Sequence, residues 1–493
     1  MRFRVCLLLL IAACAGGEST DGKGGPDDSA DGGGEGEADG ESDGAAPSTL
    51  TDLRADAGTL EPTFSPEVTA YTLTLPLQRS SVGLTVTVSA GTPTLDGEPM
   101  TAGEAGATAT LTIPLDGRSL LLDNAGLESP VTITVARGGS PSTLASASAA
   151  GEELGAALSA DSALLAAGAV RAGGGLGAVT VLRAGAVEAT LAGATVGEAF
   201  GAAVAVAGDW LAVGAPLASA GDGAVYLYQH SGGAWTLAAT LTAPTAGQAA
   251  LFGQSLALLA SGSLLVGAPG LDPDSRSAAG GAYLYTLSGA TWALSTTVTP
   301  AELGAGDRFG SAVALRDGAL AIGAPGGANG GRVAWGAEAS SLAWLSPTDQ
   351  NPGDELGAAL AFGPSGLLIG APGRDVGDLS TLTPDAGGAW YLPDSGDLVA
   401  LEPATAQAFG RFGATVAAAS DLLAVGSGNQ AQGAGALSLF GYNHLGDPEI
   451  WLRRDLVETE AGARFGAAAA FANEGLVTGR PYTAAGGALQ QIP

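Results

Sequence analysis

Four segments in the first third of the chain alternate apolar residues with threonine. They cover residues 70–76, 84–88, 109–113 and 131–135. Because successive side chains of a strand point to opposite faces, each segment predicts a strand with one buried face. Several such strands at short spacing predict a small antiparallel β-sandwich over residues 49–138.

Beyond residue 140 the pattern becomes a repeated unit. Each copy starts with Phe-Gly or Leu-Gly and continues as a hydrophobic strand, and the clearest copies, at 200–216, 252–269 and 309–325, end in Gly-Ala-Pro. The unit is 46 to 57 residues long, as the glycines of the opening pair show: Gly155, Gly201, Gly253, Gly310, Gly357, Gly413 and Gly466.

Each copy of this unit carries four strand signals. In the second copy they cover residues 202–207, 210–214, 224–228 and 235–241. Four antiparallel strands repeated seven times predict a seven-bladed β-propeller over residues 140–493. The fold class expected for the whole chain is therefore all-β. No segment sustains a helical period, which excludes a helical solenoid.

The last copy ends without a fourth strand signal. Residues 142–148, which precede the first copy, align with the fourth strand of the second copy at 235–241. We therefore predict that this N-terminal segment pairs with the last blade and closes the ring, which also removes an exposed edge.

The repeated unit resembles the FG-GAP repeats of integrin α-subunit propellers and of many bacterial exported proteins. The resemblance covers residues 140–493, and we interpret the glycines of both motifs as backbone requirements rather than binding residues. The spacing of Leu50, Phe64, Tyr71 and Arg137 resembles the bacterial cadherin-like module. That resemblance implies a spacer or adhesion unit without catalytic residues.

The N-terminus has the form of an export signal. Arg2 and Arg4 precede a short apolar run, and small residues follow it, so residues 1–13 read as a signal peptide that is too short to span a membrane. Residues 11–14 resemble the lipobox of bacterial lipoproteins, which implies cleavage before Cys14 and lipidation of its thiol. An ordinary signal peptide with an incidental cysteine is the alternative.

Residues 14–48 comprise this cysteine and an acidic segment with almost no apolar residue. Ten acidic residues accompany one lysine there, a composition that predicts a disordered tether. The net charge of −30 makes nucleic acid an unexpected partner. With Ala15 rather than Asp after the cysteine, the resemblance implies a bacterial cell envelope protein of the outer membrane, surface-exposed or periplasmic.

The sequence offers little catalytic or metal-binding chemistry. The turns between first and second strands, such as Gly208-Asp209 and Asp317-Gly318, lack the carboxylates of a calcium loop, so we expect neither a metal nor another cofactor. His230 and His444 are the only histidines, and both are predicted in exposed turns. Trp235, Trp292, Trp344 and Trp451 lie near fourth strands, where packing between blades is the expected role.

The longer loops predict a candidate binding face. They join second to third strands and each blade to the next, and they should open on the face opposite the short turns. The face would gather Asp272, Asp274, Arg276, Asp307, Arg308, Asp354, Glu355, Arg374, Asp375, Asp378 and Arg411.

From these features we expect a non-enzymatic, lipid-anchored surface protein that binds an extracellular protein or a glycan. Two alternatives remain open at this point. One is a structural envelope component without a discrete ligand, and the other is a propeller hydrolase that uses carboxylates in the mouth of the ring.

Overall fold

The computed structural model describes residues 48–492 apart from several short segments. These are residues 77–80, 104–105, 113–117, 124–129, 138–141, 148, 378–381, 420–421, 444–448, 459, 473–474 and 484–485. The expected signal peptide, Cys14 and the acidic segment therefore lie outside the described residues, as do Asp378 and His444.

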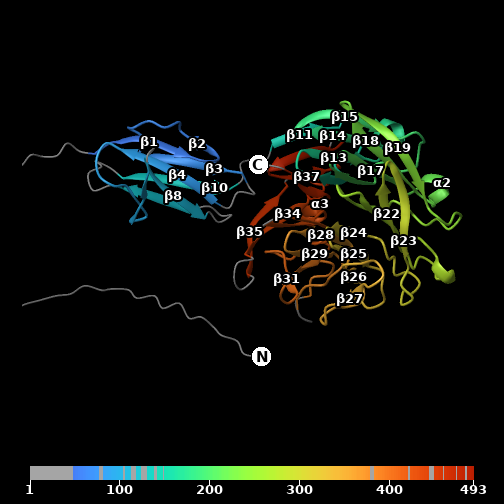
Figure 1. Ribbon diagram of the computed structural model, residues 1–493. Coiled ribbons are helices and arrows are strands. Elements are labelled where there is room, and N and C mark those ends of the chain that lie inside the picture. Colours follow the sequence, from blue (N-terminus) through green and yellow to red (C-terminus); the bar gives the residue numbers. More distant parts are fainter. Residues whose placement is uncertain are drawn as a thin grey trace, which may run out of the picture. The chain divides into compact units, whose positions relative to one another are not determined.

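The first described domain is a β-sandwich of two sheets (Figure 1). One sheet has the order β1 (Leu50–Ala55), β4 (Ser81–Val88), β8 (Gly106–Thr112) and β7 (Thr101–Gly103). The other has the order β2 (Thr59–Glu61), β3 (Ala70–Leu75), β10 (Val131–Arg137), β9 (Arg118–Asp123), β5 (Thr94–Leu95) and β6 (Glu98–Pro99).

Alternation along these strands builds the core of the sandwich. Leu73, Leu84, Leu120 and Ile133 are buried in one apolar cluster, while the intervening threonines point away from it. The predicted antiparallel sandwich contains one parallel pair, β10 with β3. These two strands are separated by several others along the chain, so no hairpin constrains their relative direction.

The second domain contains seven four-stranded sheets, each antiparallel (Figure 1). The first three in chain order are β12 (Ala157–Ala160), β13 (Leu164–Ala169), β14 (Ala178–Arg183), β15 (Ala186–Ala192); β16 (Ala203–Ala207), β17 (Trp210–Ala215), β18 (Ala224–Ser231), β19 (Ala234–Thr242); and β20 (Ser255–Leu259), β21 (Ser263–Ala268), β22 (Gly281–Ser288), β23 (Thr291–Val298).

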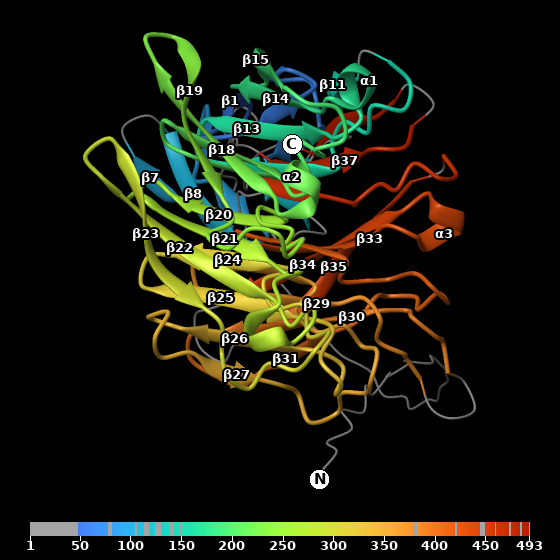
Figure 2. The ribbon, with the colours of Figure 1, turned by 90° about the vertical axis from the view of Figure 1, so that its right-hand side faces the viewer.

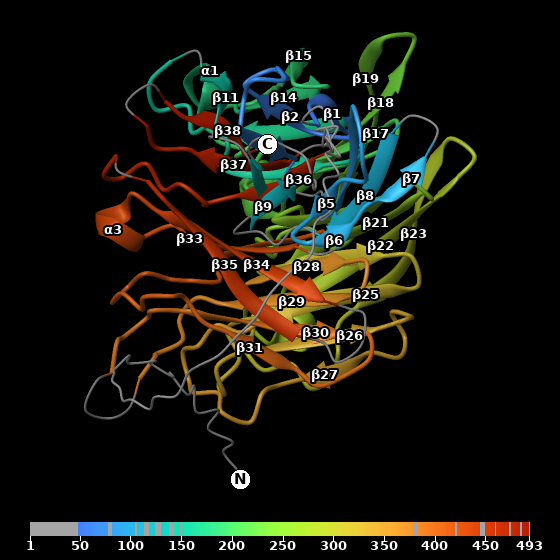
Figure 3. The same cartoon turned by 90° about the vertical axis from the view of Figure 1, so that its left-hand side faces the viewer.

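Three further sheets follow in the same order. They are β24 (Val313–Arg316), β25 (Ala319–Ala324), β26 (Arg332–Gly336), β27 (Ala343–Leu345); β28 (Ala359–Gly363), β29 (Gly366–Ala371), β30 (Gly388–Pro393), β31 (Val399–Leu401); and β32 (Thr415–Ala418), β33 (Leu422–Ser427), β34 (Ala436–Asn443), β35 (Glu449–Val457). Figure 2 shows β24 to β27 side by side in that order, and Figure 3 shows β28 to β31.

The last sheet combines the two ends of the domain. Its order is β36 (Ala469–Ala472), β37 (Gly475–Arg480), β38 (Ala488–Ile492) and finally β11 (Ser142–Ser146), which runs antiparallel to β38. The predicted closing strand is therefore confirmed. It ends at Ser146, slightly earlier than the predicted 142–148.

The first strands of the sheets form a closed ring. Each of them contacts the first strand of the next sheet, from β12 through β36, and β36 returns to contact β12. This arrangement confirms the predicted β-propeller. The helical segments among the described residues are single turns in the loops between second and third strands: α1 (Ala172–Gly175), α2 (Ala218–Gly221), α3 (Gln430–Gly433) and the 3₁₀ turn η1 (Pro273–Ser275).

Candidate functional site

The repeated motifs meet at every junction between neighbouring sheets. A Cβ built on Gly214, the glycine of one Gly-Ala-Pro, would lie 2.0 Å from the carbonyl oxygen of Gly253, the glycine of the next Phe-Gly. The same pairing recurs around the ring and closes it, because a Cβ on Gly479 would lie 1.9 Å from the Gly155 oxygen. These glycines are thus required by close backbone approach, as the sequence predicts.

The loops at this edge are joined through the backbone. The residue before each Phe-Gly or Leu-Gly pair has a positive φ, for example 56° at Arg308 and 59° at Glu355. The amide of Arg308 donates to the Ala278 oxygen at 3.0 Å, and that of Leu356 donates to the Gly330 oxygen at 2.7 Å. Each loop before a first strand is therefore fixed to a loop of the preceding sheet.

We define the loop face as the edge formed by these two sets of loops, those between second and third strands and those between sheets. Second strands end where the following first strands begin, and parallel bridges such as Gly331 with Leu356 join the two sets. The described candidate residues all lie in these loops. The predicted common location of the candidates is therefore consistent with the strand topology.

Ion pairs cross between the loops on this face. Arg332 Nη2 lies 2.9 Å from Asp307 Oδ2, and Arg374 Nη2 lies 2.8 Å from Asp349 Oδ2. Arg411 pairs with Glu355. Each pair joins a segment of one sheet to a loop beside a neighbouring one, so the arginines stabilise the face as well as charge it.

Two predicted surface carboxylates are in fact buried. Asp307 is 6% exposed and Asp354 only 2%. Asp307 Oδ2 accepts from the Gly304 amide at 2.9 Å, and Asp354 Oδ2 accepts from the Asn351 amide at 2.9 Å. Each carboxylate closes a four-residue turn, and Asp307 also pairs with Arg332, so both have a structural role. Burial raises the pKa of Asp354 above its ordinary value.

Three further candidates are bonded to loop backbone. Asp272 Oδ1 accepts from the Ala278 amide at 2.6 Å, and Asp375 Oδ1 accepts from the Asp385 amide at 2.9 Å. Arg276 donates to the Ala301 oxygen at 2.9 Å and to the Leu303 oxygen at 2.6 Å. These side chains are largely committed to holding the backbone.

The candidates that remain open to solvent are fewer than predicted. Asp274 has a side chain that is 89% exposed, and Arg308 is exposed. Glu355 and Arg411 are partly exposed, with side-chain values of 39% and 36%. Arg374 is only 14% exposed because its guanidinium lies over the Trp390 ring, 4.6 Å from the centroid.

The sequence model of the FG-GAP repeat matches residues 190–228 and 235–285, which cover the second sheet and most of the third. The matched segments contain Phe200-Gly201 and Phe252-Gly253 together with the motif that ends β17. These two segments are therefore FG-GAP repeats, and the protein is FG-GAP β-propeller-like. Propellers of this family are often related to adhesion. Among curated proteins, none matches the sequence.

The FG-GAP propeller contains loop-face ion pairs that the sequence reasoning missed. Arg171 Nε lies 2.9 Å from Glu153 Oε1, and Arg480 approaches Glu458 at 2.8 Å and Glu460 at 2.9 Å. Glu153 immediately precedes a Leu-Gly pair, as Glu355 does. Aligning this one position across the copies would have identified it.

The central channel of the FG-GAP propeller is lined by small side chains. A cavity of about 240 Å³ is surrounded by residues of first strands and the segments just before them from all seven sheets. The described lining consists of alanine, leucine, valine, serine and threonine, with Ser255, Ser311 and Thr415 as its polar members. No carboxylate is among these lining residues.

A small polar cluster lies between the first and second sheets, at the edge opposite the loop face. His230 lies at the end of β18 rather than in a turn, with its ring centroid 5.1 Å from that of Trp235, so the predicted exposed position is wrong. Glu188 accepts from Trp235 Nε1 at 3.1 Å and from Arg183 Nε at 2.8 Å. These hydrogen bonds lower the pKa of Glu188 below its ordinary value. The hydrogen bond from Arg183 has the largest effect.

The tryptophans near fourth strands pack between sheets as predicted where the structure describes them. Trp235 and Trp292 are 9% and 7% exposed. Trp344 contacts Phe309 edge-on and lies under the Arg332 guanidinium, 3.9 Å from it. The side chain of Trp451 lies outside the described set.

Among the described residues, no three of the residues His, Cys, Asp and Glu are grouped so that they could hold a metal ion. A helix both long and apolar enough to cross a membrane is also missing from that part of the chain.

Proposed function

We propose that the loop face of the FG-GAP propeller is a binding surface for an extracellular protein or a glycan. One observation carries the proposal: the loops are held by backbone hydrogen bonds and ion pairs, yet exposed groups of both charges, such as Asp274 and Arg308, remain on them. A preorganised surface loses little conformational entropy on binding, and mixed charge provides specificity.

We infer that the protein does not use this propeller as an enzyme. A hydrolase of this architecture needs a pair of carboxylates or an activated nucleophile at the channel mouth. The described lining of the channel offers hydroxyl groups and apolar side chains instead. This composition favours binding or a structural role over catalysis.

We also propose that the protein is exported and anchored by lipid at Cys14. The proposal rests on the N-terminal sequence, in which two arginines, a short apolar run and small residues precede the cysteine. The acidic segment to residue 48 then acts as a tether, and its self-repulsion extends it. The expected location is the outer membrane of a bacterial cell.

We propose a spacer role for the sandwich, as a cadherin-like module. Its support is the position of Tyr71, which stacks near Phe64 with centroids 6.2 Å apart. The Tyr71 hydroxyl donates to the Ser65 oxygen at 2.6 Å and accepts from the Ser65 amide at 3.1 Å. Phe64 and Tyr71, two of the residues that carry the resemblance, thus fix the turn before β3 together with Ser65.

The binding proposal can be tested with two variants, each of which reverses one charge at one end of β24. Arg308→Glu changes the loop face just before β24, and glutamate is tolerated there because Glu355 has the same position and φ. Asp317→Lys changes the hairpin at the other end of β24 and serves as the control. Both should leave thermal unfolding unchanged.

Glycan arrays and pull-downs with envelope or host-surface proteins would compare the two variants with the unmodified protein. We expect Arg308→Glu to weaken a captured interaction and Asp317→Lys to leave it intact. Capture that is equal for both variants would place the binding surface elsewhere. Failure to capture any ligand in either assay would favour the structural envelope role.

The anchor can be tested by cysteine substitution in the full chain. Cys14→Ser should abolish incorporation of labelled palmitate and release the protein from the membrane fraction. Cys6→Ser, within the signal, is the matched control and should retain both. Equal membrane association of the two variants would contradict the lipid anchor without affecting the loop-face proposal.

A further inference from the structure

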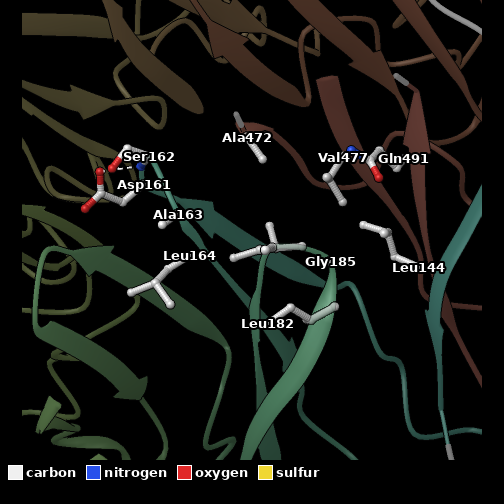
Figure 4. Close-up of a pocket in the computed structure, with 12 residues that line it drawn as sticks. Leu144, Asp161, Ser162, Ala163, Leu164, Leu182, Gly185, Ala472, Val477 and Gln491 are labelled. Carbon is white, nitrogen blue, oxygen red and sulfur yellow. Dashed lines mark hydrogen bonds between the residues drawn. The ribbon is translucent and has the colours of Figure 1, made fainter. Parts of the chain in front are cut away.

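A second cavity lies between the first and the last sheet of the propeller, away from the loop face. Its volume is about 240 Å³, and Figure 4 shows side chains of both sheets around it. The apolar residues that line it include Leu144, Leu165, Leu182, Ala472 and Val477. Leu165, Leu182 and Val477 belong to the buried cluster between these two sheets.

At two other junctions the corresponding space is filled by indole rings. Between the second and third sheets, Trp292 of β23 meets Trp210 of β17 edge-on, with centroids 5.4 Å apart. Between the first and second sheets, Trp235 of β19 is buried and its Nε1 donates to Glu188. Both fourth-strand tryptophans lie near the hairpin that joins third and fourth strands.

The strand register shows why the last junction is different. Trp235 pairs with His230 beyond the bulge of β18, and Trp292 pairs with Leu287 in the same way. In the first sheet the pairing stops at Arg183 with Ala186, and the turn Ala184-Gly185 replaces the longer hairpin. Gly185 therefore occupies the position of the tryptophan, and it lines the cavity.

The facing sheet lacks its aromatic residue as well. Trp210 lies four residues before Gly214 of the Gly-Ala-Pro motif, and Gly475 lies four residues before Gly479 at the same position of β37. Two large rings meet between the second and third sheets, and glycine replaces both of them between the first and last sheets. These two glycines leave space where the second and third sheets bring two indole rings together.

From this comparison we propose that the cavity between the first and last sheets binds a small planar aromatic compound of about the size of indole. A cavity of about 150 Å³ with apolar walls is sufficient to bind benzene, so the available volume suits a bicyclic ring. The same architecture already accepts an indole in this position at two other junctions.

Polar groups at the cavity give the ligand an orientation. Asp161 and Ser162 line one side, at the turn between β12 and β13, and the Asp161 carboxylate is bonded to the Gly208 amide of the second sheet at 2.6 Å. Gln491 lies on the other side, next to Val477 (Figure 4). A ring that carries one N–H or O–H donor can therefore place it toward the Gln491 side chain while its apolar faces contact the leucines.

The test uses 5-fluoroindole as the probe with the full chain. Fluorine NMR of the probe should show saturable line broadening in the presence of the protein. Ala163→Phe places a ring at an exposed position that lines the cavity, and should weaken binding about tenfold or more. Ala234→Phe, the same change at the exposed start of β19, is the control and should bind like the unmodified protein.

A second variant protects the test against misfolding of the first. Leu144→Ala removes an apolar wall from the far side and should weaken binding severalfold while thermal unfolding remains cooperative. Absence of saturable broadening with the unmodified protein would overturn the proposal, as would equal binding by Ala163→Phe.

One further outcome would reassign the cavity. If the protein self-associates and 5-fluoroindole disperses the oligomers, the occupant is an aromatic side chain of a second copy, for which Phe409 is 59% exposed. That result would overturn the proposal of a free aromatic ligand. All of these outcomes are independent of the loop-face proposal, because the cavity and the loop face share no residue.

Discussion

Glycine at the sheet junctions is a steric requirement at single positions. Gly214 has an extended rather than a left-handed backbone, so any L-residue could adopt its φ. What excludes a side chain is the Gly253 oxygen, 2.0 Å from the position of a Cβ. The neighbouring backbone would have to move, and that backbone belongs to the adjacent sheet.

We therefore expect Gly214→Ala to lower the free energy of unfolding by about 2–4 kcal/mol, because overpacking against backbone cannot relax locally. Gly428→Ala is the matched control, since a Cβ there meets no atom within 4 Å. Thermal and urea unfolding of both variants measure the difference. Similar midpoints for the two would contradict the junction argument.

Asp354 should make stability depend on pH in a defined direction. Its folded-state pKa is raised above the unfolded value by burial, so its contribution to stability is fully present below the unfolded pKa and is lost as pH rises through the folded pKa. Asp354→Asn keeps the acceptor for the Asn351 amide but removes the charge. We expect the variant to gain stability relative to the unmodified protein near pH 7 and to lose that advantage near pH 3.

Urea unfolding at the two pH values measures this effect. Asp317→Asn, an exposed carboxylate in the β24–β25 hairpin, is the control and should change stability little at either pH. An advantage of Asp354→Asn that is the same at both pH values would contradict the role given to charge burial.

At the scale of elements, β11 decides whether the last sheet has its outer strand. Its pairing with β38 continues past the strand end, where the Ala147 amide donates to the Gly487 oxygen at 2.9 Å. Leu144, Ala145 and Ala147 also pack against the core of the first and last sheets. The strand is short, so each bond is a substantial part of its attachment.

Ala147→Pro should remove that hydrogen bond and leave the Gly487 oxygen without its donor. We expect a loss of about 1–3 kcal/mol in the free energy of unfolding. Ala147→Ser retains the amide and is the control. Hydrogen exchange of the β38 amides provides an independent measurement, and unchanged protection in the proline variant would show that β11 contributes little.

At the scale of the whole molecule, the net charge of −30 must oppose compaction. Loop-face ion pairs offset part of this repulsion, but arginine and lysine total only 19. Sodium chloride should therefore raise the melting temperature between low ionic strength and about 0.5 M, because screening acts on the long-range repulsion first. Sucrose of equal osmolality controls for solvent exclusion, and a fall in melting temperature with salt would show that the ion pairs dominate.

The sequence was sufficient for the ring but not for the chemistry of its surface. The Phe-Gly spacing and the missing last strand predicted the sheets and β11, because both follow from periodicity. Burial of Asp307 and Asp354 could not be predicted, since it depends on how loops of different sheets fold against each other. The parallel pairing of β3 with β10 and the cavity beside Gly185 likewise depend on contacts between segments far apart in the chain.

The position of β11 has a mechanical consequence. Any pull applied through the N-terminal part of the chain reaches β11 before the rest of the propeller, because this strand is the first of the ring in sequence. The load then falls on the bonds between β11 and β38, and hence on the join between the two ends of the ring. Under sufficient tension the ring would open at that join while the other six sheets kept all their strands. The closing strand would therefore be the first part of the propeller to detach under load.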